Sequence, residues 1–293
     1  MADMDSVAVR LMRSTDVPGA ERASALGFLE VDRHYRRVNE PEPEPRSEAD
    51  AKQWSDRLRY FLTADPAGCW VATRDDEVVG LAVSQNREQL WYLASYAVLP
   101  DQQGTGIGKR LMDAVLAHAG DRAGMISASG HPGATRRYRL AGFSLHPQMR
   151  MVGTVDRSAL PAVTGLAEGT AADFDWMDRL DQQLRGVGHG PDHGYLLGAN
   201  RLVVSRAEPG YVYLDAQGNT KLLAAAHPDV ARKLLWEALA TAPGAMMINS
   251  ITTANEWAID VGLAARLDLF QEGYLALRGM TEPRPYLING AFL

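Results

Sequence analysis

The sequence predicts a mixed α/β fold of the α+β type, arranged as two similar domains in tandem. Short apolar runs separated by polar turns indicate a meander of strands at residues 69–98 and a second one at 202–226. An amphipathic helix follows each meander, with its apolar face beginning at Ile107 in the first case and at Val230 in the second. The length of 293 residues is also more than one hydrophobic core usually organises.

The composition is that of an ordinary globular protein, with 46% hydrophobic and 23% charged residues. There are 36 acidic and 30 basic residues, so the net charge of −6 argues against a general affinity for nucleic acid. The single cysteine, Cys69, rules out an internal disulfide and agrees with a reducing compartment. The chain starts without a secretory-signal pattern and contains no apolar run of bilayer length. We therefore expect a cytoplasmic protein with no membrane partner.

Strand and helix signals alternate through the first half of the chain. Ser14, Thr15 and Asp16 followed by Pro18 form a helix-start signature. The predicted elements are a strand at 7–12, helices at 20–26 and 29–38, a Pro/Glu-rich mobile surface loop at 39–50, a helix at 51–62, strands at 69–73, 78–84 and 90–98, a helix from 107, a strand at 125–128, a helix at 134–141 and a strand at 143–155.

The second half repeats the first in a degenerate form. The predicted elements are a helix at 171–184, strands at 202–205, 211–215 and 221–226, and a helix at 230–239 whose apolar spacing matches that of 107–116. Asn255-x-x-Ala258 precedes a Gly-Leu pair, as His131-x-x-Ala134 precedes a Gly-Phe pair. We therefore expect a first domain at 1–155, a linker at 156–164 and a second domain at 165–293.

A glycine-rich turn joins the strand at 90–98 to the helix that follows it. The turn runs from Gln103 to Lys109 and carries glycines at 104, 106 and 108. A strand that enters a helix through such a turn offers several backbone N–H groups and the positive end of the helix dipole to one ligand. The turn therefore predicts an anion site, most naturally for a phosphate or pyrophosphate.

The glycine spacing separates the candidate ligands. A dinucleotide fingerprint requires G-x-G-x-x-G, which Gly104, Gly106 and Gly108 do not satisfy. A Walker A loop requires a glycine and a hydroxyl residue where Gln103 and Arg110 stand. A tight turn without a ligand is the remaining alternative, although a bare connection needs only one or two glycines.

The pattern Gln103-x-x-Gly106-x-Gly108, preceded by Val98-x-Pro100, resembles the coenzyme A loop of the GCN5-related N-acetyltransferase (GNAT) superfamily. A second motif, from His131 to Phe143, resembles the family pattern Asn-x-x-Ala-x-x-x-Tyr-x-x-x-Gly-Phe with histidine in place of asparagine. The resemblance rests on specific motifs over residues 7–155. Over 165–293 it rests on element order, and the runs at 273–279 and 289–293 look like the C-terminal half of bacterial tandem GNAT proteins.

The resemblance implies that acetyl-coenzyme A is the cosubstrate and that no metal takes part. It implies cofactor contacts from Ala97, Val98, Gln103, Gly104, Thr105, Gly106, Ile107, Gly108, Lys109, His131 and Ala134. A backbone N–H at the end of the strand at 90–98 would stabilise the oxyanion. The second domain has His227-Pro228-Asp229 where the glycines would stand, so we expect no coenzyme A site of the usual kind there.

Tyr138 takes the position of the family's general acid, which protonates the departing thiolate. A phenol with a pKa of about 10 can donate to the conjugate base of a thiol with a pKa near 8.5. The alternative is a core aromatic, because Ala134, Tyr138 and Ala141 share one helical face. His131 has three candidate roles, as a contact to the cofactor, as a helix cap and as a general base.

The general base is left open by the sequence. The strand at 90–98 contains no carboxylate. The candidates are Glu88 before the strand, His131, a water wire ordered by Ser95 or Tyr96, and the terminal carboxylate of Leu293.

Two further signals are interpreted as structural. His189 and His193 are four residues apart, but a zinc site needs more ligands, and we expect a polar loop over 188–194 without a metal. Cys69 precedes a tryptophan in a predicted strand, and we expect a small buried side chain there.

The predicted function is transfer of an acetyl group from acetyl-coenzyme A to a primary amine on a small molecule or a peptide. The acidic run at 40–48 favours a cationic acceptor. A homodimer is a candidate assembly. The alternative function is a non-catalytic acyl-coenzyme A sensor or an assembly module of the same fold.

Overall fold

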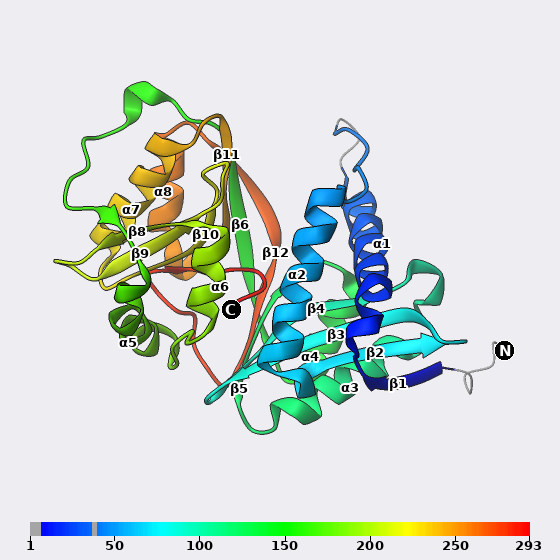
Figure 1. Ribbon diagram of the computed structural model, residues 1–293. Coiled ribbons are helices and arrows are strands. Elements are labelled where there is room, and N and C mark those ends of the chain that lie inside the picture. Colours follow the sequence, from blue (N-terminus) through cyan, green and yellow to red (C-terminus); the bar gives the residue numbers. More distant parts are fainter. Residues whose placement is uncertain (1–6, 37–39) are drawn as a thin grey trace. The chain divides into compact units, whose positions relative to one another are not determined.

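A computed structural model describes residues 7–36 and 40–293 (Figure 1). The contacts divide the chain into two compact units. The first unit comprises the chain up to Asn86 together with Trp91–Arg122, and the second comprises Arg87–Leu90 together with Ala123–Leu293. The two units meet at residue 122 of the chain. The repeat in the sequence predicts a domain boundary between 155 and 165 instead, and that boundary stays a prediction.

The first unit is a four-stranded meander with helices. Its elements are β1 (Val7–Leu11), α1 (Val17–Tyr35), α2 (Glu48–Ala64), β2 (Cys69–Arg74), β3 (Glu77–Arg87), β4 (Leu90–Val98) and α3 (Ile107–Ala119). The four strands lie in the order β1-β2-β3-β4. The strands and helices of this half match the predicted types, which follow from local apolar periodicity.

Two boundaries in this unit differ from the prediction. The helices expected at 20–26 and 29–38 form one continuous helix, α1, whose observed end is Tyr35; residues 37–39 lie outside the described part. The loop expected at 39–50 ends earlier, because α2 begins at Glu48. Ser47 caps α2, since its hydroxyl accepts the backbone N–H of Asp50 at 3.1 Å.

Helices α1 and α3 approach the meander where small residues admit them. A Cβ added at Gly27 of α1 would lie 3.3 Å from the Cβ of Ala97 in β4. A Cβ added at Gly80 of β3 would lie 3.1 Å from a methyl carbon of Leu111 in α3. Close packing at these two glycines fixes the helices against the strands that carry the loop.

The second unit contains two sheets. Its elements are β5 (Ala123–Ala128), α4 (Pro132–Leu140), β6 (Ser144–Thr154), β7 (Ala167–Glu168), α5 (Phe174–Arg185), α6 (Asp192–Ala199), β8 (Arg201–Ser205), β9 (Gly210–Leu214), β10 (Thr220–Ala225), α7 (Pro228–Thr241), β11 (Ala245–Thr252), α8 (Trp257–Ala264), β12 (Asp268–Arg278) and β13 (Tyr286–Leu287). One run of strands has the order β5-β12-β6-β11, and the other sheet has the order β13-β10-β9-β8-β7.

The predicted repeat is visible in the order of the elements. The series strand, two helices, three strands, helix, strand, helix, strand describes β1 to β6 and again β7 to β12. The apolar face predicted for the helix at 230–239 is buried in α7, where the five residues of that face are at most 1% exposed. The fold class is therefore mixed α/β, as predicted.

The sequence pattern predicted neither strand β12 nor its place in the sheet. It belongs to the second half of the sequence but pairs antiparallel with both β5 and β6, which belong to the first half. Leu275, for example, stands opposite Ser127 on one side and His146 on the other. A strand from the second copy of the repeat thus completes the sheet of the first copy.

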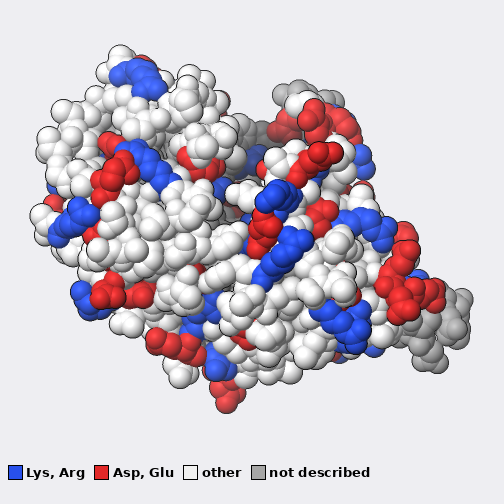
Figure 2. Space-filling view, viewed as in Figure 1, with Lys and Arg blue, Asp and Glu red and all other residues white. Residues whose placement is uncertain are grey.

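Charged side chains of both signs are intermixed on the face shown in Figure 2. Many of them are matched in pairs, such as Lys52 with Asp56 and Lys109 with Asp113. None of the helices within residues 7–36 and 40–293 has the length and apolar character needed to cross a membrane.

Candidate functional site

The glycine-rich loop lies in the first unit, between β4 and α3. Gly104 and Gly106 have φ angles of +77° and +89°, in the left-handed region that favours glycine. Gly106 is the N-cap of α3, and no side chain in the described part of the chain caps that helix start. The backbone N–H groups of the first turn and the positive end of the helix dipole are therefore available to an anion.

Polar contacts hold the loop in shape. Gln103 donates from Nε2 to the carbonyl oxygen of Val98 at 3.2 Å, which ties the loop to the end of β4. The hydroxyl of Thr105 donates to the carbonyl oxygen of Gln102 at 2.7 Å. Lys109 pairs with Asp113 at 2.6 Å on the exposed surface of α3. Gln103 and Thr105 thus shape the loop, whereas Lys109 pairs with its own helix.

Glycine occupies the third position, Gly108, because of a close contact rather than a left-handed backbone angle. A Cβ at Gly108 would lie 2.5 Å from the hydroxyl oxygen of Tyr96 in β4, so a side chain here would force the end of that tyrosine to shift. Ala97 and Val98 are buried at the end of β4, at 8% and 9% exposure. Ser95 has a buried hydroxyl that makes no hydrogen bond to the described residues.

The second predicted motif lies in the second unit and is described separately. His131 is the N-cap of α4, and its Nδ1 accepts the backbone N–H of Ala134 at 3.3 Å. Helix capping is one of the three roles expected for this histidine. Tyr138 is 4% exposed, and its carbonyl oxygen accepts the N–H of Phe143 at 3.0 Å. Gly142, with φ of +86°, turns the chain out of the helix.

Two of the candidate bases, Glu88 and Leu293, differ strongly in their exposure to solvent. Glu88 is exposed in a tight turn with φ of +48°. Leu293 is fully buried in the second unit, and its oxygen accepts a hydrogen bond from Nη2 of Arg185. Burial and the contact with Arg185 therefore argue against the oxygen of Leu293 as the base.

The position in the second half that corresponds to the loop has no glycine. His227 caps α7 in an extended conformation, and its carbonyl oxygen accepts the N–H of Val230 at 3.1 Å. Pro228 removes one N–H from the first turn. This helix start offers fewer donors than that of α3.

The polar loop predicted at 188–194 is found only over residues 188–191. His189 and His193 are both fully buried, and α6 begins at Asp192. Asp192 is also fully buried, where its carboxylate receives two hydrogen bonds from Arg87, at 2.6 and 2.9 Å. The spacing of the histidines did not reveal their burial, because the groups that cover them come from distant parts of the chain.

Cys69 is buried, as predicted, and burial raises the pKa of its thiol to about 12. A thiol with that pKa is almost entirely protonated near neutral pH and is a poor nucleophile. The single cysteine is therefore a packing residue.

The loop and the repeated order of elements define a class of α/β proteins that carry a glycine-rich helix start with backbone N–H donors. Residues 28–143 match the profile of the Acetyltransferase (GNAT) family, so this segment of the chain is similar to GNAT acetyltransferases. The match includes both the loop and the His131–Phe143 motif.

Three known proteins are similar to this chain. The chain is 25% identical over 143 residues to a holothin acyltransferase of Pseudoalteromonas sp. (strain SANK 73390); the match covers 47% of this chain and 48%, about half, of that relative. A solved structure described as a proposed acetyltransferase from Pyrococcus horikoshii has a TM-score of 0.76 at 17% identity, over 98% of this chain and 95% of the other. A tandem GNAT protein from the clavulanic acid biosynthesis pathway has a TM-score of 0.55 at 15% identity, over 94% and 100%. The likeness to these two structures shows a shared fold.

Proposed function

We propose that this protein transfers an acetyl group from acetyl-coenzyme A to a primary amine, using the loop at 103–109. The observation that carries the proposal is the uncapped, glycine-rich start of α3 within the residues that match the GNAT profile. A pyrophosphate would accept hydrogen bonds from this turn, as phosphates do at other helix starts. The relative named as an acyltransferase supports acyl transfer as the reaction.

In the proposed reaction the amine nitrogen attacks the thioester carbonyl carbon. The carbonyl oxygen becomes an oxyanion, for which we propose a backbone N–H at the end of β4, near Ala97 and Val98. The carbon–sulfur bond then breaks, and the thiolate takes a proton from the hydroxyl of Tyr138. The nitrogen loses its surplus proton to a base, and the products are an amide and free coenzyme A.

For the base we favour a water molecule at Ser95. Its buried hydroxyl has no hydrogen-bond partner among the described residues, and such groups are commonly satisfied by ordered water. His131 is less suited, because its Nδ1 accepts the N–H of Ala134. The acceptor class, a primary amine on a small molecule or peptide, is the one that the GNAT resemblance implies, and the acidic run at 40–48 favours a cationic acceptor.

We further propose that only the first half of the repeat binds acetyl-coenzyme A. The start of α7 has His227 and Pro228 where α3 has glycines, which supports this division. We also propose a domain boundary at 155–165, a cytoplasmic location and a homodimeric assembly.

Replacing Tyr138 by Phe tests the mechanism. We expect turnover to fall about ten- to a thousand-fold, the usual size of an acid–base contribution, with unchanged affinity for acetyl-coenzyme A. The measurements are release of free thiol across an amine panel and calorimetric titration with acetyl-coenzyme A. Tyr35→Phe is the matched control, because Tyr35 is 48% exposed on α1 and lies outside both motifs.

The outcomes separate the two candidate functions. Failure of the folded protein to bind acetyl-coenzyme A would contradict the proposal. Binding without thiol release from any amine would favour the acyl-coenzyme A sensor, which the absence of a carboxylate in β4 motivates. Unchanged turnover in the Tyr138→Phe variant would remove this tyrosine from the mechanism.

A further inference from the structure

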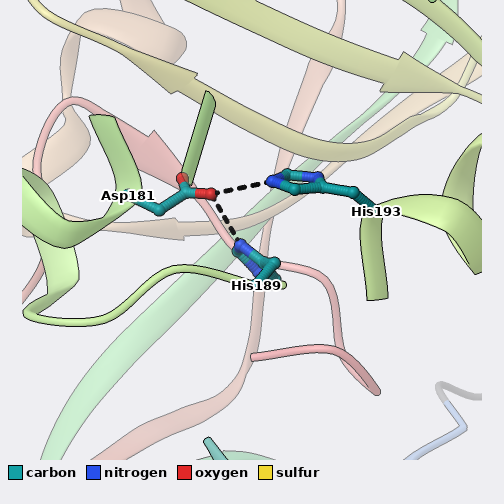
Figure 3. Close-up of side chains that lie close together, drawn as sticks. All are labelled: Asp181, His189 and His193. Carbon is teal, nitrogen blue, oxygen red and sulfur yellow. Dashed lines mark hydrogen bonds and ion pairs between the residues drawn. The ribbon is translucent and has the colours of Figure 1, made fainter. Parts of the chain in front are cut away.

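Three buried side chains of the second unit converge on one point (Figure 3). Asp181 comes from α5, His189 from the segment before α6, and His193 from α6 itself. All three are fully buried, and one ligand atom from each lies within 4.8 Å of the other two. The mechanism proposed above uses none of them.

The outer atom of each side chain has a partner that fixes its orientation. Oδ1 of Asp181 accepts the hydroxyl proton of Tyr211 at 2.7 Å. Nε2 of His189 lies 3.2 Å from the carbonyl oxygen of Phe292 and 3.3 Å from the hydroxyl oxygen of Tyr286. Nδ1 of His193 lies 3.2 Å from the hydroxyl oxygen of Tyr213.

The hydroxyl of Tyr213 has two neighbours on His193. Its oxygen lies 3.2 Å from Nδ1 and 3.4 Å from the carbonyl oxygen of the same residue. With Nδ1 on this side, the other ring nitrogen, Nε2, faces Asp178 and Asp181.

The inner atoms lie close enough together to share one cation. Nδ1 of His189 and Nε2 of His193 lie 2.8 and 3.2 Å from the same oxygen, Oδ2 of Asp181. Nε2 of His193 is buried without a well-directed hydrogen bond, and Oδ1 of Asp178 lies 3.4 Å from it. Two carboxylates beside the same buried imidazole are stabilised by a positive charge between them.

A proton and a metal ion are the two cations that fit. A proton shared between Nε2 of His193 and the carboxylates of Asp178 and Asp181 is the rival explanation. The outer contacts, with one imidazole directed at a backbone carbonyl and the carboxylate fixed by a tyrosine, are those that orient ligands in metal centres.

We propose that Asp181, His189 and His193 bind a divalent transition-metal ion, with Asp178 as the fourth ligand and Zn²⁺ as the best match. Two imidazole nitrogens and two carboxylate oxygens form a tetrahedral donor set that suits Zn²⁺ and balances its charge. Tetrahedral Zn²⁺ sites place ligand atoms about 3.3 Å apart. Three of the separations among these four atoms are 2.8, 3.2 and 3.4 Å, and the ligand atoms of Asp181, His189 and His193 all lie within 4.8 Å of one another. The proton that Nδ1 or Nε2 would otherwise hold is released when the metal binds.

The role of this ion is structural. Its ligands join α5 to α6 and to the segment between them, and the outer contacts extend to β9 through Tyr211 and Tyr213 and to the end of the chain through Phe292. Asp178 is the ligand with the most exposed side chain, at 30%, and marks the side from which a metal enters. Four ligands from the protein leave no open position for a substrate.

The test uses the full-length protein without an affinity tag. Elemental analysis is expected to find about one zinc per chain after gel filtration. Removal of the metal with a chelator is expected to lower the Tm by several degrees, and added Zn²⁺ is expected to restore it. Co²⁺ in the stripped protein should give the visible absorption of a tetrahedral site.

Variants make the assignment specific. Asp178→Asn is expected to weaken zinc binding about ten- to a hundred-fold without unfolding the protein, because this side chain lies at the edge of the cluster. His193→Gln should lose the metal. His227→Gln is the matched control, since this exposed histidine lies outside the cluster, and it should keep one zinc per chain.

Less than about 0.1 metal ion per chain, together with no change in Tm on adding Zn²⁺, would overturn the proposal. Nitrogen NMR of the zinc-supplemented protein gives a readout that does not depend on variants. Two protonated ring nitrogens on His193 would identify the cluster as a proton-bridged network. Iron or cobalt at full occupancy with the same variant pattern would support the site and replace Zn²⁺ as its ion.

Discussion

Asp16 and Asp173 perform the same task at the start of the two halves of the chain. Each closes a short 3₁₀ turn by accepting the backbone N–H of the residue three positions before it, which is Thr170 in the second case. Each also accepts two hydrogen bonds from an arginine, Arg10 or Arg206. The repeat is therefore preserved in buried polar contacts that the sequence pattern alone did not identify.

Replacing Asp173 by Asn should lower the free energy of unfolding by about 1–3 kcal/mol at pH 7, because a buried ionic hydrogen bond is lost. Hydrogen bonds from Arg206 are the largest cause that lowers the pKa of Asp173, against the opposing effect of burial. A carboxylate with a lowered pKa stabilises the fold fully above the unfolded pKa of about 4. That contribution is lost as the pH falls through the native value.

The measurement is denaturant unfolding of the wild type and the variant between pH 7 and pH 2. The difference between them should shrink below about pH 4. Asp229→Asn, at an exposed position in the first turn of α7, is the control and should change stability little. A difference that stays constant down to pH 2 would contradict the ionic explanation.

At the scale of elements, β12 depends on a glycine in its middle. The register between β12 and β6 shifts between Glu272 and Tyr274, which identifies a bulge around Gly273. A Cβ at this position would overlap the carbonyl oxygen of Ala128 in β5. The glycine is therefore needed for close approach of two backbones.

Gly273→Ala should destabilise the protein by about 1–3 kcal/mol or more, because a backbone oxygen cannot move aside as a flexible side chain can. Gly198→Ala in α6 is the matched control. Its Cβ meets nothing within 4 Å, and alanine in a helix is worth up to about 1 kcal/mol over glycine. Thermal unfolding of both variants measures the contrast, and equal Tm values would show that the bulge tolerates a side chain.

The loop before α3 is the element that the sequence described best. Three glycines, the strand before them and the helix after them are found where they were predicted. Left-handed φ angles at Gly104 and Gly106 are a local property of the backbone, so a local pattern reveals them. The close contact between Gly108 and Tyr96, in contrast, depends on packing.

At the scale of the whole molecule, the two halves of the sequence share a sheet. β12 lies between β5 and β6 in the sheet. Along the chain, however, the end of β6 at Thr154 and the start of β12 at Asp268 are 114 positions apart. Without β12, the hydrogen-bonding groups that β5 and β6 direct at it would be exposed. The first half therefore depends on the second for a complete fold.

A chain truncated after residue 155 should be insoluble or lack a cooperative unfolding transition. Coexpression with residues 156–293 should restore soluble protein, because the second fragment supplies β12. Solubility, circular dichroism and thermal unfolding of the fragment are the measurements. A soluble fragment that unfolds cooperatively would show that residues 1–155 form an independent domain.

The sequence by itself determined the order and type of the elements of the first unit, the repeat and the glycine-rich loop. These depend on apolar periodicity and on backbone angles, which are written in neighbouring residues. It also predicted Cys69 as a buried residue, but it missed α6, which begins inside the expected polar loop.

Only the tertiary structure decided where β12 pairs, that Leu293 contacts Arg185, and that His189 and His193 are buried with Asp181. Each of these contacts joins segments through partners far apart in the chain, such as Phe292, which is 103 residues from His189. Two histidines four residues apart look the same in an exposed loop and in a buried cluster. What distinguishes them is the burial and the hydrogen-bond partners that the fold assembles around them.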